Sequence, residues 1–442
     1  MPKRSIMIES VPKLDKEKRE NQAKQALDLL LNPDYQALFN KIHAEYYYWD
    51  KIKYLAPDGI DPKALWYAVK MQRELNIQTI KFGKYRFRFW ITPYMQALLH
   101  EFDMSFGGTL STNSIIPERD KNIFLTSSIM EEAIASSQME GASTTRKVAK
   151  EMLRKQSKPK NKSQQMIVNN YATIRYLVEH KNVPFSIEEL KTIHHSISSK
   201  TLDNSEDEGQ IRTDDKVLVM DNITGEIAHT PPSYSELGEL LTDMCHFANE
   251  DQSSTFIHPI VKGIIIHFLL AFIHPFADGN GRTARSLVYW YMLQKGYWLT
   301  EYLSISRIIY KNKKQYEKVF LYTESDDLDL SYFILFNLKS MKKAYEELQV
   351  YLNLKISQQS SVHRFKNLHG INERQAQVLR IISDNPSVIL TAKELSTRLG
   401  VTVRTARTDL QQLVAHGFMV ETALNKRMIG YVRSDNFESL VK

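Results

Sequence analysis

The sequence predicts a mainly α-helical protein that has one small β-hairpin in its central region and a separate winged-helix domain at its C-terminal end. The first observation is a shortage of turn-forming residues: the 442 residues include 16 glycines and 14 prolines, about 7% together, against roughly 12% in average proteins. The second is that most segments carry apolar residues at helical spacing. The third is that strand-like patterning is clear in the central region only between residues 209 and 232.

Composition narrows the class of protein further. Because 43% of the residues are apolar and 25% are charged, the chain can bury sizeable cores and is not disordered by composition. The net charge of +7 suits partners that carry phosphate. A single cysteine, Cys245, excludes an internal disulfide or a thiolate zinc cluster and favours a cytoplasmic location. The longest apolar run, 263–273, is shorter than the roughly 20 residues of a membrane span, so we expect a buried helix and no membrane partner.

Residues 1–110 are predicted to form a helical N-terminal accessory region. Its aromatic side chains include Tyr46, Trp49 and Trp66, and we expect them to build a core rather than a ligand platform. An alternating stretch, 84–90, predicts a short strand with arginines on one face.

The central region, 111–340, is expected to hold the chemistry. An apolar-periodic helix is predicted at about 126–141. A basic segment at 154–162 is expected to be a solvated loop, with nucleic-acid contact as the alternative. A hairpin, called the flap below, is predicted over about 212–232, with its turn at 222–225. The first strand of the flap is expected to consist of Val217, Leu218, Val219 and Met220.

The most informative segment is 274–285, with the sequence His-Pro-Phe-Ala-Asp-Gly-Asn-Gly-Arg-Thr-Ala-Arg. It follows the apolar helix expected at 259–273 and precedes a second helix expected at about 283–295. Gly279 and Gly281 flank an asparagine just before that helix, so that backbone N–H groups can turn toward one point. With the helix dipole behind them, these groups form an anion site.

Four side chains around this nest have complementary chemistry. Arg282 and Arg285 lie three residues apart and can face one anion with forked donors. Asp278 supplies a hard oxygen ligand that suits Mg²⁺ held jointly with phosphate oxygens. His274 is the one group there that can take a proton near neutral pH. A base, a metal ligand and an anion nest within twelve residues predict phosphate chemistry.

This segment resembles the signature of the Fic family, H-x-F-x-[D/E]-G-N-G-R-x-x-R, and matches it at every defining position. The resemblance covers roughly 120–335 and includes Gly209 to Arg212 before the flap and His258-Pro259 at the start of the apolar helix. It implies a Fic-type helical core that transfers AMP from ATP to a hydroxyl group of a target protein and releases pyrophosphate.

The resemblance also implies a role for each motif residue. His274 would be the general base, and Asp278 would hold Mg²⁺ between the α- and β-phosphates. Arg282 would grip the β-phosphate, and Arg285 would orient the γ-phosphate. The anion hole would consist of Gly279, Asn280 and Gly281.

Outside the motif, the flap resembles the hairpin that pins the target segment by strand addition. Tyr316 falls where family members use a tyrosine near the nucleoside. The usual asparagine eight residues later is Glu324 here, which puts the adenine-side contacts in doubt. Because Gly281 is intact, phosphorylation with reversed ATP is disfavoured.

A segment upstream of the motif resembles the family's inhibitory sequence, [S/T]-x-x-x-E-[G/N], through Ser136, Glu140 and Gly141. Gly141 is also expected to end its helix as a C-terminal cap. Glu140 would pair with Arg285 and remove the fork intended for the γ-phosphate. We therefore expect an autoinhibited enzyme that is weakly active as the wild type.

The C-terminal part is expected to begin with a connecting helix at 341–370 and to end with a winged helix-turn-helix at 371–442. The residues expected to contact DNA stand at the front of its recognition helix: Thr402, Arg404, Thr405 and Arg407. This block has ten basic and seven acidic residues, a weak excess for a DNA reader, so docking to a protein or dimerisation is the alternative.

The sequence therefore predicts an autoinhibited protein adenylyltransferase that uses ATP and Mg²⁺. Two alternatives stay open: a transcription regulator whose core senses ATP, and an enzyme that uses the same site to remove AMP. The expected partners are ATP, a protein target that could be the chain itself, DNA through the C-terminal domain, and a second copy in a homodimer.

Overall fold

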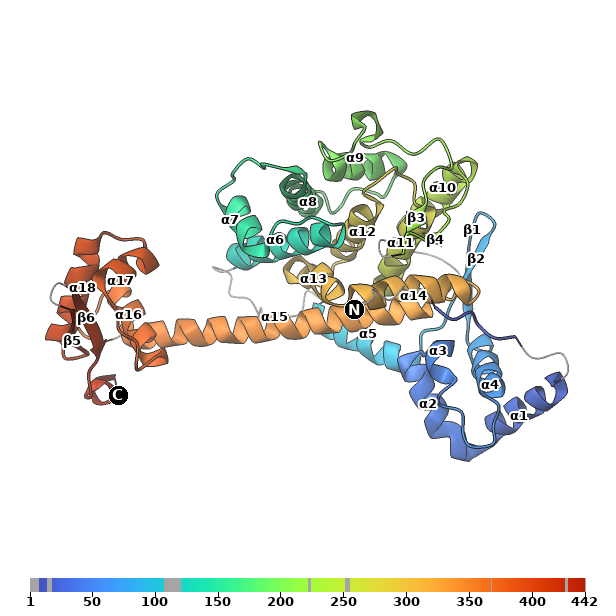
Figure 1. Ribbon diagram of the computed structural model, residues 1–442, viewed down its shortest axis with the longest axis horizontal. Coiled ribbons are helices and arrows are strands. Elements are labelled where there is room, and N and C mark those ends of the chain that lie inside the picture. Colours follow the sequence, from blue (N-terminus) through green and yellow to red (C-terminus); the bar gives the residue numbers. More distant parts are fainter. Residues whose placement is uncertain are drawn as a thin grey trace. The chain divides into compact units, whose positions relative to one another are not determined.

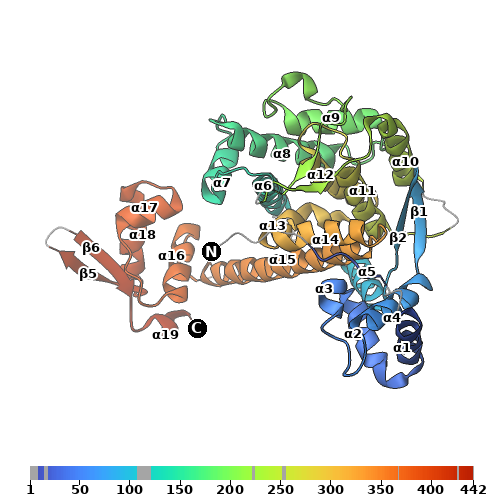
Figure 2. The same cartoon turned by 45° about the vertical axis from the view of Figure 1, so that its right-hand side comes forward.

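The computed structural model describes residues 8–13, 18–106, 121–221, 224–250, 255–366, 368–425 and 428–441. The chain divides into two compact units, one up to Leu348 and one from Gln349 onward. Both are mainly helical, as predicted, and the strands of the described residues form three separate two-stranded antiparallel sheets (Figures 1 and 2). The boundary expected near residue 110 lies outside the described residues.

The first unit begins with the accessory helices and a hairpin. Its helices are α1 (Arg19–Leu31), α2 (Gln36–Glu45), α3 (Trp49–Ile52), α4 (Pro62–Glu74) and α5 (Pro93–Phe106), with a 3₁₀ turn at Pro33–Tyr35. Ala26, Phe39 and Trp66 are among the buried side chains of a shared core, which confirms the expected accessory core.

The accessory hairpin pairs β1 (Gln78–Phe82) with β2 (Tyr85–Phe89). Strand β2 was predicted, and Phe87 and Phe89 are buried while Arg86 is exposed. Strand β1 was missed because its sequence, Gln-Thr-Ile-Lys-Phe, has few apolar residues to give a period-2 signal.

A buried arginine joins the accessory helices to the rest of the unit. The guanidinium of Arg73 lies 3.9 Å from the ring centroid of Tyr46 and donates to the Tyr332 hydroxyl at 2.7 Å. The Tyr46 hydroxyl donates to Asp329 at 2.7 Å, and Arg73 itself is fully buried. A buried cation with this many partners fixes α2 and α4 against the start of α15 (Ser331–Lys366).

The remaining helices of this unit surround the predicted motif. They are α6 (Lys121–Met139), α7 (Arg146–Arg154), α8 (Lys162–Glu179), α9 (Ile187–Ser198), α10 (Leu237–Asn249), α11 (Pro259–Ile273), α12 (Asn280–Gln294), α13 (Ile305–Lys311), α14 (Lys313–Ser325) and the first half of α15 (Ser331–Lys366). Short 3₁₀ turns occupy Ser205–Asp207, Tyr234–Glu236 and Trp298–Tyr302. The basic segment forms the loop between α7 and α8, as expected.

Helix α11 is buried along nearly its whole length, which confirms the interpretation of the apolar run. It packs against α12, and the short connection between the two helices is the predicted motif (Figure 1). Helix α12 begins at Asn280, three residues earlier than expected, because Gly279 adopts the left-handed conformation that starts it. The first polar groups of α12 therefore belong to the motif itself.

The flap is shorter than predicted. Its strands are β3 (Val219–Met220) and β4 (Ile227–His229), with Val219 opposite His229 and a bulge after it. The prediction of a strand at Val217 and Leu218 was wrong. Continued along this register, the ladder would place Val217 opposite Pro231, and a proline has no N–H to donate. Residues 222–223 of the expected turn lie outside the described residues.

The second unit has the order of elements of a winged helix. Its elements are α16 (Glu373–Asp384), α17 (Ala392–Leu399), α18 (Val403–Ala415), β5 (Met419–Asn425), β6 (Met428–Arg433) and α19 (Phe437–Val441). Thr391 caps α17 and Thr402 caps α18, each by accepting a backbone N–H three residues ahead. Leu379, Leu410 and Phe418 lie in its separate core.

The connecting helix is longer than expected because α15 begins at Ser331 rather than near residue 341. Its first turns are apolar and buried, with Phe333, Ile334 and Leu338 fully covered. They belong to the core of the first unit. Among the described helices, none combines the length and the apolar character needed to cross a bilayer.

Candidate active site

His274 stands at the turn that ends α11. Its backbone is left-handed, with φ 49° and ψ 58°, which carries the chain away from the helix axis. Its Nδ1 lies 3.1 Å from the carbonyl oxygen of Ala271, so that Nδ1 carries the proton and Nε2 keeps its lone pair. Burial lowers the pKa of His274 to about 4. At neutral pH the ring is uncharged and can accept a proton.

The loop after His274 is closed by the side chain of Asn280. Its Oδ1 accepts from the Phe276 N–H at 3.0 Å, and its Nδ2 donates to the Phe276 carbonyl at 2.8 Å. The amide side chain therefore shapes the loop. What the start of α12 can offer an anion is its backbone N–H groups, starting with those of Asn280 and Gly281.

A histidine outside the motif holds this loop in place. His194, on α9, stacks on Phe276 with ring centroids 3.7 Å apart and an interplanar angle of 2°. Its Nε2 donates to the Asp278 carbonyl at 2.7 Å, while its Nδ1 accepts from the Gly209 N–H at 3.0 Å. Burial lowers its pKa to about 4, in agreement with this neutral tautomer. These contacts give His194 a structural role, which is to support the loop that carries Phe276 and Asp278.

Arg282 is a buried cation whose donors are only partly used. Its side chain is 1% exposed, and one terminal nitrogen donates to the Ile197 carbonyl at 3.1 Å. Its Nε is buried without a hydrogen-bond partner among the described residues. Burial lowers the pKa of Arg282. A buried guanidinium with an unused donor is costly in an apolar environment unless an anion completes it.

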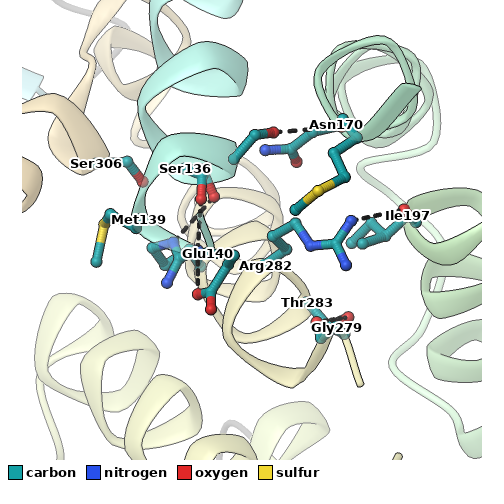
Figure 3. A network of polar contacts seen from close by, with 12 residues as sticks. Ser136, Met139, Glu140, Asn170, Ile197, Gly279, Arg282, Thr283 and Ser306 are labelled. Atoms are coloured by element: carbon teal, nitrogen blue, oxygen red, sulfur yellow. Dashed lines mark hydrogen bonds and ion pairs between the residues drawn. The ribbon is translucent and has the colours of Figure 1, made fainter. Parts of the chain in front are cut away.

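Arg285 is occupied by the segment that is expected to be inhibitory. Its Nε donates to the Ser136 hydroxyl at 2.9 Å, and one terminal nitrogen donates to Glu140 Oε1 at 2.8 Å. Burial acts to raise the pKa of Glu140, but the charges of Arg285 and Arg282 outweigh it, so that the pKa is lowered and the carboxylate is ionised. Figure 3 shows Ser136 and Glu140 together at the end of α6, with Arg282 on the neighbouring helix.

Glu140 also lies against the glycine of the predicted anion hole. A Cβ atom added to Gly281 would stand 2.2 Å from Glu140 Oε1, so only glycine permits this approach. Gly141 ends α6 with φ 89°, and the Lys313 ammonium donates to the Met139 carbonyl at 2.7 Å. The carboxylate is thus fixed beside the start of α12, where the negative charge of a phosphate would otherwise be stabilised.

The surroundings of Asp278 decide which kind of metal site it can form. Its residue is exposed, and one carboxylate oxygen accepts from the Gly279 N–H at 2.5 Å. No group of three potential metal-binding side chains occurs among the described residues. A single open carboxylate beside an anion nest fits Mg²⁺ that shares its coordination with phosphate oxygens, and it does not fit a cage built from protein alone.

Tyr316, the residue predicted to lie near the nucleoside, is buried and bonded to another side chain. The Tyr316 hydroxyl lies 2.8 Å from His267 Nε2, and the residue is 8% exposed. Burial raises its pKa to about 12. Glu324 pairs with His229 of the flap at 2.8 Å. The charge of Arg285 and a hydrogen bond from its side chain act to lower the pKa of Tyr316, so this tyrosine lies beside a motif residue. The nucleoside contact itself stays a prediction.

Arg212 is a further residue whose role the sequence did not reveal. Its Nε donates to the His274 carbonyl at 3.0 Å, and it also donates to the carbonyl of Pro232. It therefore ties both ends of the flap to the turn that carries His274. The partners are 62 and 20 residues away in the chain, so no local pattern could have identified them.

In the second unit, the residues expected to contact DNA lie at the start of α18. Arg404 and Arg407 are exposed and one turn apart. The Thr402 hydroxyl lies 2.8 Å from that of Thr405 and caps the helix, so its first role is structural. The two arginines are the side chains here that remain available to a phosphate.

Comparison with protein families agrees with this geometry. The model of the Fic/DOC family matches residues 184–292, and the model of an HTH domain matches residues 374–432. The chain carries a Fic domain. The matched part runs from the start of α9 through the motif and most of α12, and a helix-turn-helix domain follows it.

Curated relatives match the Fic domain over a short stretch. Protein adenylyltransferase Fic of Drosophila grimshawi is 39% identical over 69 residues, which is 16% of this chain and 14% of that protein. Protein adenylyltransferase fic-1 of Caenorhabditis elegans is 43% identical over 68 residues, covering 15% and 13%. The match therefore spans about a seventh of the length of these relatives.

Solved structures share the fold over a longer part. A Fic family protein from Desulfovibrio desulfuricans G20 aligns with a TM-score of 0.50 and 20% identity over 78% of this chain and 97% of that one. Fic-1 from Caenorhabditis elegans, residues 134–508, aligns with a TM-score of 0.51 and 17% identity over 78% and 94%. The likeness in fold thus extends well beyond the Fic domain.

Proposed function

We propose that the chain is an autoinhibited protein adenylyltransferase. The observation that carries the proposal is the contact of Glu140 with Arg285 beside the start of α12, where a carboxylate takes the place of a phosphate. A neutral base, His274, stands at the other end of the same loop. The names of the relatives of the Fic domain support the reaction class.

In the proposed reaction, a hydroxyl oxygen of the target protein attacks the α-phosphorus of ATP. A new O–P bond forms, the bond to the bridging oxygen breaks, and pyrophosphate leaves. His274 accepts the hydroxyl proton at Nε2, since Nδ1 is held by the Ala271 carbonyl. The backbone N–H groups at Asn280 and Gly281 and the donors of Arg282 stabilise the phosphate oxygens.

We further propose that Asp278 holds Mg²⁺ together with the phosphates of bound ATP. The ion would supply positive charge to phosphate oxygens. The described residues contain no group of three potential metal-binding side chains, so the affinity of Asp278 for the metal should depend on the nucleotide.

The proposed brake acts on the alignment of ATP. While Glu140 holds Arg285, the γ-phosphate lacks its guanidinium, and the carboxylate repels the phosphate chain. A displacement of the α-phosphate by about 1 Å can cost about 10²-fold in rate. The flap would present the target segment by strand addition along β3, where Met220 is 44% exposed.

The position of the label in ATP tests the reaction class. We expect the Glu140→Gly chain to label protein in a cell lysate from ATP labelled at the α-phosphate and not from ATP labelled at the γ-phosphate. Glu140→Gly combined with His274→Ala should give no label from either nucleotide. Label from the γ-position would instead show phosphorylation.

Two alternative functions can be distinguished by separate measurements. If the wild-type chain, with Glu140 in place, releases AMP from protein labelled by the Glu140→Gly chain, the site also removes AMP. The HTH domain and its exposed arginines support DNA binding as a second candidate function, and salt-dependent binding tests it. A chain that binds DNA in response to ATP and labels nothing would be a regulator.

A further inference from the structure

His229 occupies an unusual position between two oxygen acceptors. It belongs to β4 of the flap, and its side chain is 9% exposed. Its Nδ1 lies 2.8 Å from Glu324 Oε2 on α14, and its Nε2 lies 2.8 Å from the carbonyl oxygen of Phe272 on α11. Three elements that are distant in the sequence therefore meet at one imidazole ring.

The two acceptors specify the protonation state of this ring. A carbonyl oxygen and an ionised carboxylate both only accept, so each ring nitrogen must carry a hydrogen. Neutral imidazole has one N–H, and only imidazolium has two. The Phe272 carbonyl also lies in the last turn of α11, where the helix dipole favours a positive charge. Donation from both ring nitrogens to these two oxygens makes the ring a buried cation.

The contacts of His229 reach the catalytic turn. Phe272 is two residues before His274, and its carbonyl is one of the terminal carbonyls of α11 that have no partner within the helix. Arg212 holds the other side of the same turn through the His274 carbonyl. Arg212, before the flap, and His229, in its second strand, therefore both bind carbonyl oxygens at the turn that carries His274.

We propose that His229, as imidazolium, is a positioning residue that locks the flap onto the turn carrying His274 and releases it when the proton is lost. The effect of the lock on target binding rests on the proposed function, whereas the existence of the lock does not depend on it. After deprotonation only one of the two hydrogen bonds can persist, because one nitrogen becomes an acceptor facing an acceptor.

The charged and titratable groups around His229 set the direction of its response. Burial acts to lower the pKa of His229, and Glu324 together with the Phe272 carbonyl outweighs it, so that the pKa is raised above 6.5. Among the described residues, His274 is a titratable group whose pKa the charge of His229 acts to lower, and it is neutral because burial lowers its pKa. The lock is therefore complete below pH 6.5 and is lost as the pH rises through the raised pKa.

Histidine NMR of the full chain tests the lock without any activity. We expect one histidine to titrate above pH 6.5, its signal to be absent in His229→Gln, and its midpoint to fall by about one unit or more in Glu324→Gln, which removes the charge and keeps the shape. His246→Gln, which replaces an exposed histidine on α10, should leave that signal in place. A His229 that is neutral at pH 6.5 would overturn the proposal.

Kinetics then test the consequence for the reaction. In the Glu140→Gly background we expect the KM for the protein target to rise with pH over the range in which His229 titrates, and Glu324→Gln to move that rise to lower pH. In His229→Gln the KM should be high at every pH and independent of it. A KM that rises with pH alike with and without His229 would contradict the proposal. Absence of label in every variant would refute the proposed function, while the NMR result would still decide the lock.

Discussion

At the scale of single residues, the site combines groups that the motif shows with groups that only folding brings near. His274, Asp278 and the two arginines lie within twelve residues, so their joint chemistry could be predicted from spacing. His194 is 84 residues from the Asp278 carbonyl that it binds, and His229 is 95 residues from Glu324. Their partners are set by packing of α9 and α14, which no short pattern encodes.

The low pKa of His274 has a consequence for the pH profile. A base must be deprotonated to work, so AMP transfer by the Glu140→Gly chain should be insensitive to pH between about 5.5 and 6.5 and fall only as the pH approaches about 4. Removing Glu140, which raises this pKa, favours the neutral ring further. The rate of AMP transfer at saturating ATP, measured as a function of pH, tests this expectation. Circular dichroism at the same pH values excludes acid unfolding. A midpoint near 6.5 would contradict the burial argument.

His194 should matter for stability as well as for activity. Replacement by alanine removes a ring stacked on Phe276 and leaves the Asp278 carbonyl and the Gly209 N–H without their partner. We expect a loss of about 2–4 kcal/mol in the free energy of unfolding, measured with urea.

The neighbouring residue provides the control. His195 has a side chain that is 62% exposed, and His195→Ala should change the free energy of unfolding by less than about 0.5 kcal/mol. Equal effects of the two substitutions would show that the contacts of His194 with the loop do not contribute to stability.

At the scale of elements, the sequence predicted helices better than strands. The end of α6 lies close to its predicted position and is followed by Gly141, which has a positive φ. Helix α12 starts three residues before its predicted position, because Gly279 is already left-handed. Strand β1 was missed because its sequence has few apolar residues, and the length of β3 was overestimated because Pro231 lies opposite Val217 in the continued register. Whether a segment forms a strand therefore depends also on the residues of the partner strand that lie opposite it.

The flap offers a test at this scale. Arg212 is 8% exposed and binds oxygens of the catalytic turn and of both flap ends, so Arg212→Met should free the flap. We expect about 10²-fold slower AMP transfer in the Glu140→Gly background and faster hydrogen exchange over residues 214–232. Lys216→Met, at a side chain that is 87% exposed, is the matched control and should change neither. Unchanged exchange in Arg212→Met would argue against the anchoring role.

At the scale of the whole molecule, the family resemblance predicted a Fic core, and the residue pattern of the last block predicted a winged helix. The family models match a Fic domain and an HTH domain, and β5 pairs with β6 as the wing. The division into two compact units falls within α15 at residue 348 rather than at the start of a predicted connecting helix. Apolar spacing continues through Ser331–Leu348, and only packing shows that these turns belong to the first unit.

The second unit makes a prediction about DNA. If α18 binds phosphate through Arg404 and Arg407, replacing both by alanine should weaken DNA binding and reduce the slope of log K against log salt by about 2. Fluorescence anisotropy of the full chain with duplex DNA measures both quantities. Arg398→Ala, on α17, removes an arginine that already pairs with Glu394 and should leave the slope nearly unchanged. Equal slopes for all three proteins would favour protein docking by this domain.

The proposed brake depends on the contact of Glu140 with Arg285. The initial rate of AMP transfer tests this contact most directly. With ATP labelled at the α-phosphate, Glu140→Gly should label protein about 10²-fold faster than the wild type. Glu179→Gly, which removes a 62% exposed glutamate at the end of α8, should label at the wild-type rate. Equal rates for the wild type and Glu140→Gly would contradict the proposed brake.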